Sequence, residues 1–141
     1  VLRALVHLRR RLVDLPEALV DLRGRLRHPG EPAVDPEVEL PEADLIWAGF
    51  SLFFCPPGRW SEVWPKVRAA VRPGGRFGGQ ILGERDTWAS EQEISSFSRE
   101  DGRALFDGFE IERFEEEEED GEACSGPKHW HLFHVLARRS A

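Results

Sequence analysis

The sequence predicts an α/β domain built on a mixed sheet, and three neighbouring features carry that prediction. A nearly unbroken apolar run at 44–55 suits a strand that is buried on both faces. An amphipathic segment at 58–71 suits a helix, and the corner Arg72-Pro73-Gly74-Gly75 then turns the chain into an apolar strand at 76–82. Proline ends the helix, and glycine accepts the positive φ angles of such a reversal. Two strands joined by a helix are expected to be parallel.

Length, charge and cysteine content set the broad class of the protein. The 141 residues fit one domain, and 40% hydrophobic with 32% charged residues is typical of a soluble globular chain. A net charge of −7 argues against nucleic-acid binding, which needs a basic face. Cys55 and Cys124 are too few for a disulfide framework, so we expect a reducing, cytoplasmic location. No apolar run approaches the ~20 residues that cross a bilayer, so no membrane partner is expected.

Residues 1–34 are expected to form a helical segment that is distinct from the sheet. Apolar residues recur at helical spacing in 1–13, and Asp14 can cap a second helix that ends near Gly30. This amphipathic start could lie on a membrane, but its interleaved acidic residues favour packing against the sheet. The chain begins at Val1 and contains no methionine, which predicts a fragment or a processed product.

Residues 35–141 are expected to supply the sheet and its two helices. Pro65, inside the segment 58–71, predicts either a kink or a later start of that helix. Ser98 can cap a second helix that runs through Phe106 and stops at Gly108.

The last two predicted strands lie at 109–114 and 129–138. The acidic run 115–120 between them is expected at the solvated tip of a hairpin. No helix joins these two strands, so the last strand is expected to run antiparallel, near one edge of the sheet.

Four motifs in this order carry a resemblance to a known family. They are LPEADLIWA at 40–48, RPGGRF at 72–77, FEIERF at 109–114 and GPKHWH at 126–131. Together they resemble the carboxy-terminal half of class I S-adenosylmethionine-dependent methyltransferases, from the fourth strand to the seventh. Small bacterial methyltransferase-domain proteins, some labelled tellurite-resistance-like, are the most similar group. The resemblance implies a Rossmann-like sheet over about 35–141, and methyl transfer from S-adenosylmethionine to a small acceptor.

The resemblance also implies positions for the cofactor and the acceptor. In the family, the cofactor lies across the carboxyl ends of the first four strands. The matching residues here are Ala48, Gly49, Phe50, Ser51 and Asp35. Glycine at 49 would let a ligand approach the backbone closely, or it would only relieve crowding against a neighbouring helix.

The loop 84–88 follows the strand 76–82 at its carboxyl end. In the family this loop faces the acceptor, which implies Trp88 as a lid and Asp86 or Glu84 as the group that orients a nucleophile. The alternative is a solvated loop whose ion pairs contribute little. Methyl transfer needs mainly alignment of nucleophile and methyl group, so residue types alone identify no catalytic base.

The family's glycine-rich cofactor loop has no counterpart in 1–34. Gly24 and Gly30 stand alone, and no apolar strand pattern precedes Asp35. Without a first strand, the run 44–55 becomes an edge with unpaired backbone groups. We therefore expect a truncated or frame-shifted chain whose cofactor binding is impaired. The alternatives are a non-catalytic remnant or interaction module that pairs through 44–55, for example as a homodimer, and a different nucleotide-binding α/β protein.

Three histidines gather on the last predicted strand. His129 and His131 are expected to point to one face, as zinc ligands might, and His134 to the other, with Cys124 nearby. No second cluster of suitable spacing completes a site. Aromatic packing near the end of the sheet is therefore expected in place of a metal.

Overall fold

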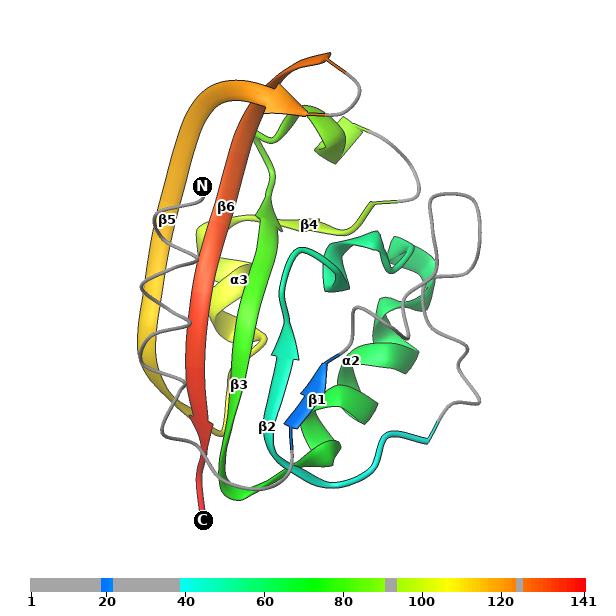
Figure 1. Ribbon diagram of the computed structural model, residues 1–141, viewed down its shortest axis with the longest axis vertical. Helices are drawn as coiled ribbons and strands as arrows, with labels where there is room; N and C mark the ends of the chain where they lie inside the picture. Colours follow the sequence, from blue (N-terminus) through cyan, green and yellow to red (C-terminus); the bar gives the residue numbers. More distant parts are fainter. Residues whose placement is uncertain (1–18, 22–38, 91–93, 124–125) are drawn as a thin grey trace.

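The computed structural model describes residues 19–21, 39–90, 94–123 and 126–141, and these form a mixed sheet flanked by helices (Figure 1). Its strands are β1 (Leu19–Asp21), β2 (Ala43–Ala48), β3 (Val71–Gly83), β4 (Ser96–Phe97), β5 (Phe109–Ala123) and β6 (Gly126–Arg139). The order across the sheet is β1-β2-β3-β6-β5, and β4 pairs with β3 off this path. Strands β1, β2 and β3 are parallel, whereas β6 runs antiparallel to both β3 and β5. The predicted α/β class and the antiparallel last strand are confirmed.

Two α-helices confirm the helical predictions for 58–71 and for the segment after Ser98. Helix α2 (Trp60–Ala70) begins two residues later than the apolar pattern implies and contains Pro65. Helix α3 (Arg99–Ala104) is capped by Ser98, whose Oγ accepts a hydrogen bond from the Asp101 backbone N–H at 3.1 Å. Among the described residues, no helix is long and apolar enough to cross a membrane.

The larger core lies between α2, α3 and one face of the sheet. Trp64 of α2 makes edge-on ring contacts with Phe77 of β3 at 5.4 Å and with Phe106 at 5.2 Å between centroids. Its indole Nε1 donates to the Leu105 carbonyl at 3.1 Å, so the polar end of this buried ring is also satisfied. The apolar stripe that predicted the helix is therefore the stripe that packs on the sheet.

The corner at 72–75 follows the end of α2, as its proline and glycines predict, but β3 already begins at Val71, so the corner lies within the strand that was expected to start at 76. Ala43 of β2 pairs with Val71, but Leu45 pairs with Arg76, so the intervening residues of β3 bulge out of the ladder. Gly74 adopts a φ of 78°, a conformation that side chains disfavour. The glycine at this position is needed for the reversal itself.

The expected second helix, from the Asp14 cap to near Gly30, is wrong at Leu19–Asp21. These residues form β1, which pairs in parallel with residues 45–47 of β2. The partner strand overrides the local helical spacing, because pairing satisfies backbone groups that β2 would otherwise leave open. The run 44–55 is therefore not an unpaired edge at these residues, and the alternative of a homodimer through that edge stays a prediction. The remainder of 1–34 lies outside the described residues.

The predicted strand at 44–55 is too long, and β2 ends at Ala48. Residues 49 and 50 form a turn, and Leu52–Phe54 form a 3-10 helix. Phe53 is buried in a second, smaller core with Leu82 and Leu132. The apolar run thus indicates that these residues are buried. It does not distinguish a strand from a buried turn of helix, because both are apolar.

The acidic run 115–120 does not lie at a hairpin tip. It belongs to β5, which pairs with β6 as far as Ala123 and Gly126. The strand tolerates five consecutive glutamates because several of their carboxylates meet arginine or histidine side chains.

Candidate functional site

The carboxyl ends of β2 and β3 meet at one edge of the sheet. Strand β2 ends at Ala48 and β3 ends at Gly83, and the two strands are parallel neighbours. Ligands of open α/β sheets bind outside the carboxyl ends of parallel strands. The turn after β2 and the loop after β3 therefore frame the candidate site.

The turn after β2 contains the backbone outlier Phe50. Its φ is 48°, in the left-handed region, which disfavours a residue with a side chain by roughly 1–2 kcal/mol. The Phe50 backbone N–H donates to the Gln80 side-chain Oε1 at 3.0 Å. Gln80 lies on β3 and is fully buried, so the sheet itself holds the turn in this conformation.

Ser51, the next residue, has a buried side chain whose hydroxyl makes no hydrogen bond. It is 4% exposed, and its Oγ is one of four buried side-chain atoms in the described part of the chain that lack a partner. Leaving a buried polar group unpaired costs about 1–3 kcal/mol, so such a group points to a ligand.

The structure brings four of the five expected cofactor residues into this one turn. Ala48 and Gly49 are buried, Phe50 is half-buried, and Ser51 carries the unpaired hydroxyl. Asp35 lies outside the described residues. That these residues hold a cofactor stays a prediction.

Asp86, in the loop after β3, is fully buried and has no free oxygen. Oδ1 meets the Lys128 ammonium and accepts from the Trp88 backbone N–H at 2.9 Å. Oδ2 accepts from the His131 backbone N–H at 2.9 Å. The Asp86 carboxylate thus ties the loop to β6, and its expected role in orienting a nucleophile stays a prediction. The alternative of a solvated loop fails at this residue.

Lys128 is a buried charged side chain of this site that the sequence reasoning missed. Its side chain is 1% exposed, and Nζ lies 4.4 Å from the ring centroid of Trp88 and 3.9 Å from that of Trp130. Both rings thus stabilise the buried cation in addition to Asp86. The motif at 126–131 contains this lysine, but nothing local marks it as buried. Trp88 is half-buried here, and its role as a lid stays a prediction.

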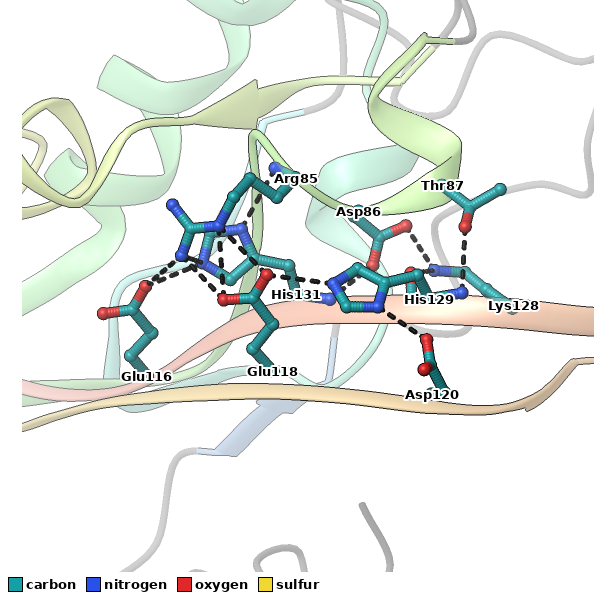
Figure 2. A network of polar contacts seen from close by, with 9 residues as sticks. All are labelled: Arg85, Asp86, Thr87, Glu116, Glu118, Asp120, Lys128, His129 and His131. Carbon is teal, nitrogen blue, oxygen red and sulfur yellow. Dashed lines mark hydrogen bonds and ion pairs between the residues drawn. The ribbon is translucent and has the colours of Figure 1, made fainter.

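Arg85 connects the same loop to β5 through ion pairs (Figure 2). Its Nη2 lies 2.9 Å from a Glu116 oxygen and 2.7 Å from a Glu118 oxygen. The hydrogen bond from His131 holds the pKa of Glu116 below its usual value, and that from Arg85 lowers the pKa of Glu118 to about 2. Both carboxylates are therefore charged partners of the loop at neutral pH.

The same carboxylates and His131 are the closest approach to a metal site among the described residues. One ligand atom each of Glu116, Glu118 and His131 lies within 4.8 Å of the others. However, the Arg85 guanidinium already binds both carboxylates, so a metal ion would have to displace it. We assign no metal here.

The histidines divide between the two faces of the sheet as strand alternation predicts. His129 and His131 contact Glu118 and Glu116, whereas His134 contacts Gln80 and Glu117. Cys124 lies outside the described residues.

A cavity of about 520 Å³ lies beside the same edge of the sheet. It is lined by Pro57, Trp60, Ala89, Ser90, Ile94, Ser95, Ser96 and Phe97. These residues come from the segments that follow β2 and β3, and the volume is typical of small-molecule sites. The Trp60 Nε1 is buried without a hydrogen-bond partner, which leaves one donor unused among the side chains of this lining.

His129 is expected to titrate above its ordinary range. Hydrogen bonds to Asp120 and to Glu118 favour the imidazolium and raise the pKa of His129. Because the folded pKa is raised, the stabilisation is complete below the unfolded value near 6.5 and is lost as the pH rises through the folded pKa. An NMR titration of the His129 ring measures this. Asp120→Asn should lower the pKa and Glu122→Gln should not, and a pKa at or below 6.5 in the parent chain would contradict the assignment.

Solved structures that share this fold include methyltransferases. A SAM-dependent methyltransferase from Methanosarcina mazei matches with a TM-score of 0.55 at 16% identity, over 74% of this chain and 64% of its own. TehB from Haemophilus influenzae matches with a TM-score of 0.59 at 12% identity, over 98% and 46%. The N-methyltransferase NodS from Bradyrhizobium japonicum matches with a TM-score of 0.52 at 11% identity, over 74% and 55%.

These matches establish the fold, which is that of class I methyltransferases. At these identities they show the fold alone, and the chain spans about half to two thirds of the length of each structure. No protein-family model and no curated protein matches the sequence.

Proposed function

We propose that this chain binds S-adenosylmethionine and takes part in methyl transfer to a small acceptor. The fold match to a SAM-dependent methyltransferase and to an N-methyltransferase is the observation that carries this proposal. The buried, unpaired hydroxyl of Ser51 supports it, because that hydroxyl lies at the edge where the fold class binds its ligands.

In this proposal the turn 48–51 holds the cofactor. Gly49 would let the ligand approach the backbone, and Ser51 Oγ would gain its missing hydrogen bond. The sulfonium of S-adenosylmethionine supplies the methyl group, so the chain has mainly to orient the acceptor and exclude water. The cavity beside Trp60 is a place of suitable size for a small acceptor.

Strand β1 favours cofactor binding over the competing proposal of a chain that keeps the fold without the ligand. Its presence beside β2 supplies the neighbouring strand whose carboxyl end adjoins the turn 48–51. Gly24, three residues after β1, is the sole glycine in 19–29. Because the segment after β1 lacks the family's run of glycines, we propose an affinity in the micromolar range or weaker.

Calorimetry with S-adenosylhomocysteine tests the proposal. We expect saturable binding to the parent chain, and Ser51→Ala should weaken it roughly two- to tenfold, the equivalent of one hydrogen bond. Ser61→Ala is the matched control, because Ser61 lies on the exposed surface of α2 and lines neither the turn 48–51 nor the cavity. The absence of binding at millimolar ligand would favour the competing proposal.

A further inference from the structure

A line of buried polar contacts crosses the sheet and ends at the turn after β2. Glu117 of β5 contacts Nε2 of His134 on β6, and His134 Nδ1 lies 3.3 Å from Nε2 of Gln80 on β3. The Gln80 Oε1 then accepts from the Phe50 backbone N–H at 3.0 Å. Gln80 is fully buried and His134 is 2% exposed, so water does not readily substitute for either group.

The donors and acceptors along this line follow from the one group whose role is fixed, the Phe50 backbone N–H. A backbone N–H can only donate, so the Gln80 atom that meets Phe50 must be the carbonyl oxygen. The Gln80 amide nitrogen therefore faces His134, and Nδ1 of that ring must accept. The ring proton consequently lies on Nε2, where it donates to the Glu117 carboxylate.

This order of donors fixes the orientation of the Gln80 amide. A flipped amide would place its NH₂ group against the Phe50 N–H, two donors facing each other in a buried position. Nδ1 of His134 accepts from the amide in its observed orientation only, and Glu117 keeps the ring proton away from that nitrogen. Phe50 needs such support, since a left-handed non-glycine residue persists only where its surroundings hold it.

We propose that Gln80 and His134 are positioning residues for the cofactor turn 48–51. They hold Phe50 in its left-handed conformation and thereby set where Gly49 and Ser51 lie. The expected effect on cofactor affinity rests on the proposed function. The support that Gln80 and His134 give to the conformation of Phe50 does not, because it is a property of the chain without ligand.

His131 provides a matched control on the same strand. It is also buried, at 1% exposed, and also pairs with a β5 glutamate, Glu116. Its Nδ1, however, accepts from the Arg85 backbone N–H at 3.1 Å, so it holds the loop after β3 and makes no hydrogen bond to the turn after β2.

Hydrogen exchange of the Phe50 amide tests the hold without any ligand. Gln80→Leu and His134→Leu should each speed Phe50 exchange at least tenfold more than they speed exchange of the Phe77 amide in the core of β3. His134→Asn should restore protection, because its Oδ1 replaces the Nδ1 acceptor, and His131→Asn should leave Phe50 unchanged. Gln80→Met provides a second test if the leucine variant does not fold. Equal changes at Phe50 and Phe77 would overturn the inference.

Binding of S-adenosylhomocysteine by the same variants tests the consequence. We expect Gln80→Leu and His134→Leu to weaken binding at least fivefold, with His134→Asn close to the parent. Faster Phe50 exchange with unchanged affinity would overturn the positioning role. A parent chain that does not bind the ligand would instead overturn the proposed function, and Phe50 exchange would still decide whether Gln80 and His134 hold the turn.

Discussion

Replacing Lys128 with methionine is expected to destabilise the folded chain by about 3–5 kcal/mol, because breaking a buried ion pair leaves a charge without its partner. The Asp86 and Lys128 side chains are 0% and 1% exposed. Methionine keeps an unbranched, apolar side chain of similar length between Trp88 and Trp130, so the change removes the charge and little packing. Urea denaturation, with the free energy of unfolding extrapolated to water, measures the loss.

Two controls separate the ion pair from general effects of the substitution. Lys66→Met on the exposed side of α2 should change the free energy of unfolding by less than about 0.5 kcal/mol. Asp86→Asn combined with Lys128→Met should recover part of the loss, because the buried negative charge is then gone. A loss below about 1 kcal/mol for Lys128→Met alone would show that Asp86 finds another partner.

Replacing Gly79 with alanine is expected to destabilise the chain by about 2–3 kcal/mol through overpacking between β2 and β3. A Cβ at this position would lie 2.4 Å from the Ala48 carbonyl oxygen and 2.8 Å from its carbonyl carbon. These are backbone atoms of the paired strand, so relief requires the ladder to separate. The displacement falls on Ala48, the last residue of β2 and one of the proposed cofactor residues, so affinity for S-adenosylhomocysteine should fall as well under the proposed function.

Gly78→Ala is the matched control, because it adds the same group one residue earlier on the opposite face. Its nearest atoms belong to the Trp47 side chain at 3.0 Å, which can yield by a few tenths of an ångström. Thermal and urea unfolding of both variants measure the difference. Equal losses of unfolding free energy at the two positions would contradict this explanation. They would show that Gly79 is not needed for the close approach of β3 to the Ala48 backbone.

Elements with a strong local signal could be predicted from the sequence. The apolar stripe of α2, the proline and glycines at 72–75 and the serine cap of α3 each act within a few residues, and each is present in the structure. The antiparallel final strand was also predictable, because a short connection without a helix allows only that direction.

Elements decided by a distant partner could not be predicted in this way. Strand β1 has three residues, too few to show a period of two, and its state depends on the backbone of β2. The length of β5 depends on cations supplied by Arg85, Arg99 and β6, so the acidic run gave no sign of a strand. The end of β2 at Ala48 depends on a glutamine 30 residues later in the chain that holds Phe50.

The candidate site shows the same division. The turn 48–51 and the loop 84–88 follow predicted strands, so their place at one edge of the sheet followed from parallel pairing. The pairing of Asp86 with Lys128 and of Gln80 with His134 joins residues 42 and 54 positions apart. Such partners are set by the register of β3 against β6.

By itself, the sequence determined the α/β class, the helices α2 and α3, the corner that follows α2, and the edge of the sheet at which the turn after β2 and the loop after β3 lie. Only the tertiary structure decided that β2 has a neighbour, that the glutamates line a strand, and which buried charges and amides meet. The physical reason is one of range. Periodicity, caps and turns are satisfied within a few residues, whereas a buried polar group needs a partner that only strand register can supply.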